Sequence, residues 1–216
     1  MAKNTVWHDD DWLLLMQKYL QKPIGVKPLY SRPMVELSLE LHIAPQVLQS
    51  KMQQIARLDT PRIERIWNTY SQNPRRLARA VRLWREMKGF GFADNFYDGV
   101  EVQETFEKDF RSLPENPLYT PVMLILILDL FFRLTPATMV AETPEVQELA
   151  RLLKLKPTDV TLVLNVFQRC DPYLNRDNQI TSELMAPCKQ VWQRYGTIAT
   201  EQLAAYAEEL KEYYKS

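Results

Sequence analysis

The sequence contains little glycine, cysteine or histidine, and each shortage excludes a class of protein. Five glycines among 216 residues leave few positions for tight β-hairpin turns, whereas Leu, Gln, Glu, Lys, Arg and Ala, which favour helix, recur in segment after segment. Two cysteines, Cys170 and Cys188, make no disulfide framework and are expected to be a reduced pair. The sequence therefore predicts an all-α fold.

Motifs that carry catalysis are also missing. The sequence has no Gly-rich phosphate loop, no CxxC pair, and no Ser or Cys nucleophile in a recognisable setting. His8 lies beside Asp9, Asp10 and Asp11, but these carboxylates suit the N-cap and first turn of a helix better than a metal site. Because no polar constellation converges, we predict that the protein is not an enzyme and has no metal site and no cofactor.

No apolar run is long enough to cross a bilayer. The longest, Val122 to Phe132, is preceded by Pro121 and closed by Arg133, and a transmembrane helix needs about 20 residues. A helix that is apolar on every side is typical of the centre of a core. Residues Met1 to Asp11 show no apolar segment or cleavage site of a signal peptide. We therefore expect a cytoplasmic protein without a membrane segment.

The net charge is zero overall but not within each half. Residues 1–95 hold 15 Lys and Arg against 9 Asp and Glu, and residues 96–216 hold 12 against 18. Such a dipolar chain can fold one half onto the other, or associate head to tail with its neighbours as a homo-oligomer. It can equally present its basic half to DNA.

The sequence also repeats itself. Residues 7–59 align without a gap onto residues 119–171, an offset of 112, and apolar positions match in kind between the identities. The identities are Leu14, Glu36, Leu37, Leu41, Pro45 and Asp59, which recur as Leu126, Glu148, Leu149, Leu153, Pro157 and Asp171. We predict a tandem duplication of a helical unit: a basic unit over residues 1–88, a linker with a short helix over 89–117, and an acidic unit over 118–216.

Within each unit the same helix signals occur twice. A first helix is predicted over 9–20 and 121–133, and a second over 33–42 and 144–154. A third helix begins at Pro45 or Pro157, since proline is favoured in the first turn. The short turn between the second and third helices has helix-turn-helix proportions. The predicted buried residues are Leu14, Leu37, Leu41, Ile55, Leu126, Leu149, Leu153 and Phe167, and the linker helix is predicted over Val100 to Phe110.

One succession of residues carries a family resemblance: Trp7 before the acidic run, Trp12 to Met16, Lys22 to Gly25, Met34 to Leu41, and Pro45 to Asp59. It resembles the N-terminal helical segment ahead of the catalytic domain in some bacterial HNH-type endonucleases, and more loosely it is similar to Myb/SANT-type three-helix modules. The resemblance covers about fifty residues of each copy, and Trp7 becomes Tyr119 in the second. It implies a DNA-associated accessory module without the nuclease, because neither His8 nor His42 lies in an HNH motif.

The third helix of the first copy is a candidate DNA-reading element. Glutamine can hold adenine through two hydrogen bonds, and arginine can hold guanine or phosphate. The candidate residues are Gln46, Gln49, Gln53 and Arg57. A solvated helix face is the alternative interpretation. The matching face of the second copy, from Thr158 to Arg169, is largely apolar and begins beside Asp159, so we interpret it as a core or interface element.

The fifth helix of the first copy carries the strongest functional signal. Arginines recur at spacings of three and four, between apolar residues such as Leu77 and Val81. They are Arg75, Arg76, Arg79, Arg82 and Arg85. Basic amphipathic helices bind nucleic acid, anionic membranes or acidic protein surfaces. A solvated face is again the alternative.

Our leading hypothesis is a noncatalytic, DNA-associated, helix-turn-helix-like protein that binds double-stranded DNA. The alternative is a protein-protein interaction or scaffold module of tandem helical repeats, in which the basic helix docks on an acidic protein surface. If the first copy contacts DNA through its third and fifth helices together, Arg75, Arg79 and Arg82 should be exposed and continuous with the face that holds Gln49 and Gln53. Pairing of these arginines with acidic residues of the fold would remove the main support for it.

Overall fold

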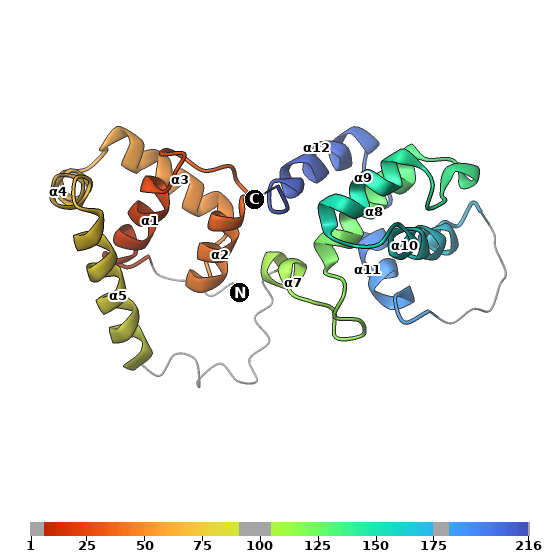
Figure 1. Cartoon of the computed structure of the whole chain (residues 1–216), viewed down its shortest axis with the longest axis horizontal. Helices are drawn as coiled ribbons and strands as arrows, with labels where there is room; N and C mark the ends of the chain where they lie inside the picture. Colours follow the sequence, from red (N-terminus) through yellow and green to blue (C-terminus); the bar gives the residue numbers. More distant parts are fainter. Residues whose placement is uncertain (1–6, 91–104, 175–181, 216) are drawn as a thin grey trace. The chain divides into compact units, whose positions relative to one another are not determined.

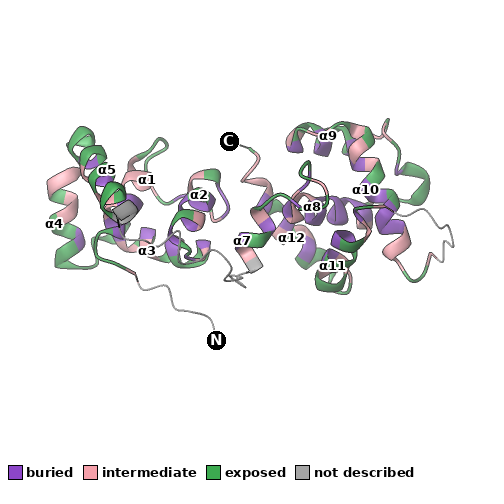
Figure 2. Cartoon of the chain, turned by 90° about the horizontal axis from the view of Figure 1, so that it is seen from below, coloured by how far each residue is buried: buried purple, intermediate pink, exposed green. Residues whose placement is uncertain are grey.

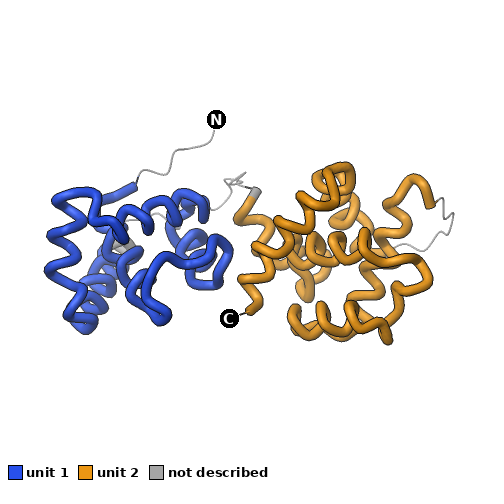
Figure 3. Tube along the Cα trace, turned by 90° about the horizontal axis from the view of Figure 1, so that it is seen from above, with its two compact units in different colours: residues 1–104 blue, residues 105–216 orange. Residues whose placement is uncertain are grey.

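A computed structural model describes residues 7–90, 105–174 and 182–215 of the chain (Figure 1). In these ranges all regular structure is helical, which confirms the predicted all-α class. The chain divides into two compact units, residues 1–104 and 105–216, coloured separately in Figure 3. None of the helices within the described ranges is both long and apolar enough to span a membrane.

Prolines begin most of the helices, as their fixed φ and missing N–H group favour. Unit 1 contains α1 (Asp11–Leu20), α2 (Arg32–Leu41), α3 (Pro45–Arg57), α4 (Pro61–Tyr70) and α5 (Pro74–Phe90). Unit 2 contains α7 (Thr105–Phe110), α8 (Pro121–Arg133), the 3-10 turn η1 (Pro136–Thr138), α9 (Pro144–Leu153), α10 (Pro157–Cys170), α11 (Met185–Tyr195) and α12 (Thr200–Lys211).

The second and third helices of the two units have matching bounds. Helix α9 begins and ends 112 residues after α2, and α10 begins 112 residues after α3. The residue after each second helix, His42 in unit 1 and Lys154 in unit 2, adopts the left-handed conformation with φ of 55° and 59°. This conformation ends a helix sharply and lets the next one begin at once. Both units therefore contain the predicted short turn between two helices.

Unit 1 is built around α1, which contacts α2, α3, α4 and α5. Leu14, Leu15 and Met16 of α1 are at most 1% exposed. They pack in one cluster with residues of the other helices, among them Leu37 and Leu48. Figure 2 shows the buried residues on the inward sides of the helices. The apolar residues of α1 and of the helices around it therefore form the core of this unit.

Unit 2 is built around α8, as its continuous apolar run predicts. Helix α8 contacts α7, α9, α10, α11 and α12, and residues 124–128 are fully buried. At its C-terminal end Phe131 lies edge-to-face with Trp192, with ring centroids 5.7 Å apart. All eight residues predicted to be buried, four in each unit, are buried.

The short helix α7 belongs to unit 2 rather than to a linker. The carboxylate of Asp109 accepts two hydrogen bonds from the Arg194 guanidinium, at 2.7 and 2.8 Å, and Phe110 contacts Tyr213 edge-to-face. The linker predicted over residues 89–117 therefore overlaps unit 2, which begins at residue 105. Arg194 and Tyr213, which come much later in the chain, hold α7 in this unit. Of the helix predicted over Val100 to Phe110, residues 100–104 lie outside the described ranges.

We expect Leu41→Ala to lower the free energy of unfolding by about 2–5 kcal/mol, because the substitution leaves a cavity in a packed core. Leu41 is 4% exposed in the unit 1 core. Leu83→Ala is the control, since Leu83 is 47% exposed and should change stability by no more than about 0.5 kcal/mol. Urea unfolding followed by circular dichroism measures both, and equal losses would contradict the assigned core.

We expect Arg194→Ala to destabilise unit 2 by about 1–3 kcal/mol, because it leaves the Asp109 carboxylate buried without its partner. Asp109 is 4% exposed. The double variant Asp109→Ala with Arg194→Ala should lose less than the single variant, because no unpaired charge remains in the fold. Thermal unfolding of the full chain tests this, and a double variant that is less stable than Arg194→Ala would refute the interpretation.

Candidate nucleic-acid interface

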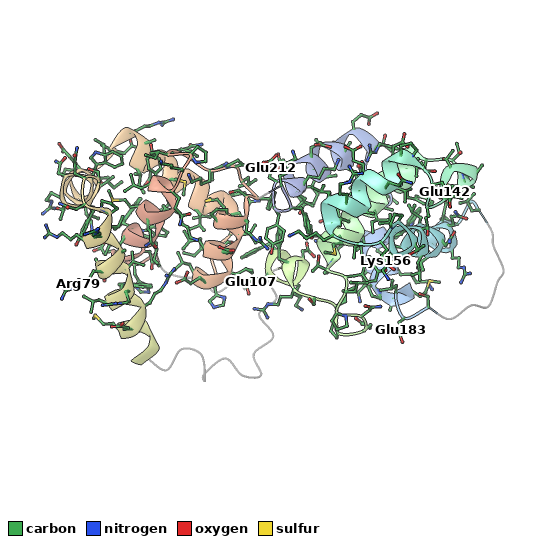
Figure 4. The ribbon with its side chains drawn as sticks, viewed as in Figure 1. Arg79, Glu107, Glu142, Lys156, Glu183 and Glu212 are labelled. Atoms are coloured by element: carbon green, nitrogen blue, oxygen red, sulfur yellow. The ribbon has the colours of Figure 1, made fainter. Side chains whose placement is uncertain are left out.

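The inward face of α5 determines where its arginines point. Leu77 and Val81 are 2% and 1% exposed, and α5 packs on α1 and α4. With 3.6 residues per turn, Arg75, Arg79 and Arg82 fall on the side of the helix opposite these two residues. All three are exposed, and Figure 4 shows Arg79 pointing away from the unit. We call these three residues the arginine face.

The five candidate arginines of α5 have different surroundings. Within the described ranges, Arg75 and Arg79 form no ion pair, and Arg82 lies 3.5 Å from Glu86 in a pair exposed on both sides. Arg76 lies over the Tyr70 ring, 5.6 Å from its centroid. An exposed i,i+4 pair contributes only about 0.3–0.5 kcal/mol. The arginine face therefore keeps most of its positive charge available to a partner.

Arg85 is used inside unit 1. Its Nε and Nη2 atoms donate to the Glu40 carboxylate of α2 at 2.7 and 2.9 Å. The pKa of Arg85 is raised, chiefly by the hydrogen bonds to Glu40 and against the opposing effect of burial. This bidentate pair joins α5 to α2. Among the residues predicted to contact DNA, Arg85 therefore already holds α5 on α2 through Glu40.

Two of the four candidate residues on α3 are also engaged within the unit. The Gln46 side-chain amide donates to the Tyr30 hydroxyl at 3.0 Å, and that of Gln49 donates to the Lys27 carbonyl at 3.3 Å. Gln53 and Arg57 are exposed and form no hydrogen bond with a described residue. Two of the amides predicted to read bases therefore hold the loop between α1 and α2, residues 21–31, in place.

This loop is held on α3 by Lys27, a residue the sequence did not single out. Lys27 is 5% exposed, and its ammonium donates to the carbonyls of Gln21, at 2.6 Å, and Pro23. Its backbone N–H points at the Met52 sulfur of α3. Burial lowers the pKa of Lys27. The loop thereby positions the carbonyl that Gln49 contacts.

The arginine face is not continuous with the polar face of α3. Helix α5 packs on α1 and α4, while α3 packs on α1, α2 and α4, and α1 lies between α3 and α5 in Figure 1. Since each helix turns its apolar side to α1, the two polar faces point away from each other. A straight duplex is too stiff to reach both at low cost. The expected joint surface is therefore not formed.

Helix α10 lines a groove in unit 2. The groove has a volume of about 440 Å³, and its walls are Thr158, Thr161, Leu162, Asn165, Val166, Arg169 and Ser182. Val166 is buried and Leu162 is 46% exposed. Asp159, at the start of the helix, accepts a hydrogen bond from the Lys156 N–H and so caps α10. This helix face is therefore partly core and partly an open groove.

The described residues contain no group of three or more His, Cys, Asp or Glu side chains placed to hold a metal ion. Burial raises the pKa of the Cys170 and Cys188 thiols, so both are protonated at neutral pH. Thiolates are the nucleophilic form of cysteine, and these two residues offer no activated nucleophile.

No protein-family model, curated protein or solved structure matches the chain. The resemblance to the helical segment of HNH-type endonucleases accordingly stays a prediction.

We expect Gln49→Ala to destabilise unit 1 by about 1 kcal/mol, because it removes the hydrogen bond to the Lys27 carbonyl. Gln53→Ala is the matched control on the same helix and should change stability by less than about 0.5 kcal/mol. Chemical unfolding of both variants makes the comparison. A Gln53 variant that is as destabilised as the Gln49 variant would contradict the assigned roles.

Proposed function

We propose that the protein is a noncatalytic, DNA-associated protein that binds the phosphates of double-stranded DNA through the arginine face of α5. The observation that carries this proposal is the exposure of Arg75, Arg79 and Arg82 on a face where Arg75 and Arg79 have no ion-pair partner among the described residues. Guanidinium groups suit phosphate because they offer paired donors in a planar fork and stay charged.

The spacing of these arginines fits a duplex backbone. Arg75 and Arg82 are seven residues apart, so their Cα atoms are separated by about 10 Å along the helix axis. B-DNA carries one phosphate charge per about 1.7 Å of axis, so several phosphates lie within that distance. Binding releases condensed counterions and therefore weakens steeply as salt is added. The arginine face thus supports contacts that do not depend on base sequence.

The proposed function gives α3 no part in reading DNA bases, although the amino-acid sequence suggested one. The amides of Gln46 and Gln49 already donate within the unit, and α3 faces away from the arginine face. Gln53 and Arg57 are available for a separate contact. We therefore propose phosphate binding by α5 without base readout by α3.

We further propose that the two units are tandem copies of one helix-turn-helix-containing ancestor. The proposal is supported by the shared offset of 112 in the bounds of the second helices and in the two left-handed caps. In this proposal unit 1 keeps a basic surface for the duplex, and unit 2 has become an acidic, structural unit. We expect a protein with this role to be cytoplasmic.

One observation favours the alternative, a protein-protein interaction or scaffold module. Leu83 and Met87 of α5 are 47% and 73% exposed beside the arginine face. Exposed apolar side chains next to positive charge fit an acidic protein surface with an apolar centre better than a phosphate backbone. In this alternative, binding to the protein partner depends on Met87, whereas binding to the duplex does not depend on it.

We expect the full chain to bind a fluorescein-labelled, mixed-sequence duplex with an affinity that falls steeply with salt. Changing Arg79 and Arg82 together to Ala should weaken binding to all sequences alike. It should also reduce the slope of log K against log salt by about two, because two phosphate contacts are lost. Fluorescence anisotropy at several salt concentrations measures both quantities.

Arg57→Ala is the matched control, because Arg57 is an exposed arginine on α3. It should leave the affinity and the slope unchanged. An unchanged slope in the α5 variant, or a complete lack of duplex binding by the wild-type chain at low salt, would reject the proposed function. A lack of duplex binding at low salt, with the arginine face exposed, would favour the protein-partner alternative.

A further inference from the structure

Helices α5 and α12 hold equivalent positions in their units. Helix α5 packs on α1, the central helix of unit 1, and α12 packs on α8, the central helix of unit 2. Their inward residues lie 126 positions apart: Leu77, Val81 and Trp84 in α5, and Leu203, Ala207 and Leu210 in α12. Leu77, Val81 and all three residues of α12 are at most 2% exposed, and Trp84 is partly buried. The two helices therefore turn equivalent residues outward.

The outward residues carry opposite charges. Arg75 of α5 is matched by Glu201 of α12, and Arg82 is matched by Glu208. Between them, Arg79 is matched by Ala205. All of these residues are exposed. One position in the architecture thus presents a basic face in unit 1 and an acidic face in unit 2.

The acidic face keeps charge available to a partner. Glu201 forms no ion pair or hydrogen bond with a described residue. Glu208 pairs with Lys211, and Glu212 accepts from Lys215 at 2.7 Å. The hydrogen bond from Lys211 lowers the pKa of Glu208, so this carboxylate is ionised at neutral pH. Surface pairs of this kind contribute little, and a guanidinium can replace the ammonium.

We propose that the arginine face of α5 in one copy of the chain docks on the face of α12 that holds Glu201, Ala205 and Glu208 in a second copy. Charge complementarity identifies the partner, because a duplex has no affinity for the acidic face and the chain itself supplies both faces. The small side chain of Ala205 leaves room for Arg79 where the two helices cross at a spacing of about 8–10 Å.

This contact goes beyond DNA association and does not depend on it. Both interactions use Arg75, Arg79 and Arg82, so a duplex and a second copy compete for α5. A contact between two helices is smaller than a standard protein interface of about 1,600 Å². We therefore expect weak association that weakens further as salt screens the charges.

Sedimentation velocity of the full chain over a range of concentrations provides the first test. At about 50 mM salt the mean sedimentation coefficient should rise with concentration, and at about 500 mM the rise should disappear. A single monomer at every concentration at low salt would overturn the proposal. Salt-dependent compaction of that monomer would overturn it as well, because the faces would then meet within one chain.

A charge exchange gives the decisive test. The first variant carries Arg75→Glu and Arg82→Glu, and the second carries Glu201→Arg and Glu208→Arg. Each variant alone has a net charge of the same sign on both faces and should stay monomeric. Their equimolar mixture restores complementary faces and should associate at least as strongly as the wild-type chain. Circular dichroism confirms that both variants keep their helices.

An equimolar mixture that stays monomeric would reject the proposed contact. Association that persists in each variant alone would place the interface elsewhere and would reject it too. A further variant, Glu201→Gln with Glu208→Gln, separates this inference from the proposed function because it leaves α5 intact. It should lose self-association and bind the labelled duplex at least as tightly as the wild-type chain, so the two proposals fail or succeed independently.

Discussion

In each unit one central helix buries its apolar residues under several neighbours, and the neighbouring helices are placed by the need to cover it. In unit 1 this helix is α1, where Leu14, Leu15 and Met16 are buried, and in unit 2 it is α8, where residues 124–128 are fully buried. Covering a helix on several sides requires several amphipathic partners. Each partner turns one apolar side to the centre, and its polar side faces away from that centre.

That constraint decides which side chains are available for function. Because Leu77 and Val81 must face α1, Arg75 and Arg79 have to face solvent, and because Leu203 must face α8, Glu201 has to face solvent. The core does not specify the charge of these outward residues. The same scaffold can therefore present a basic helix in one unit and an acidic helix in the other. In our account, interaction with the duplex and with a second copy both arise from this division.

Local chemistry made much of the fold predictable from the sequence. Prolines mark the starts of α3 and α10, and apolar spacing identified buried residues such as Leu41 and Phe167. The missed features depend on distant contacts. Gln49 is held by a loop that Lys27 secures, and α7 is held by Arg194, which lies 85 residues from Asp109 in the chain. The separation of the arginine face from α3 by α1 depends on how whole helices pack, which periodicity does not report.

We propose that the duplex binds to the arginine face of α5. An NMR titration of the arginine Nε–Hε resonances with a mixed-sequence duplex at low salt tests it most directly. We expect shifts for Arg75, Arg79 and Arg82, with the resonances of Arg57 and Arg194 unchanged. Shifts confined to Arg57, or the absence of any shift on α5 while the duplex is bound, would contradict it.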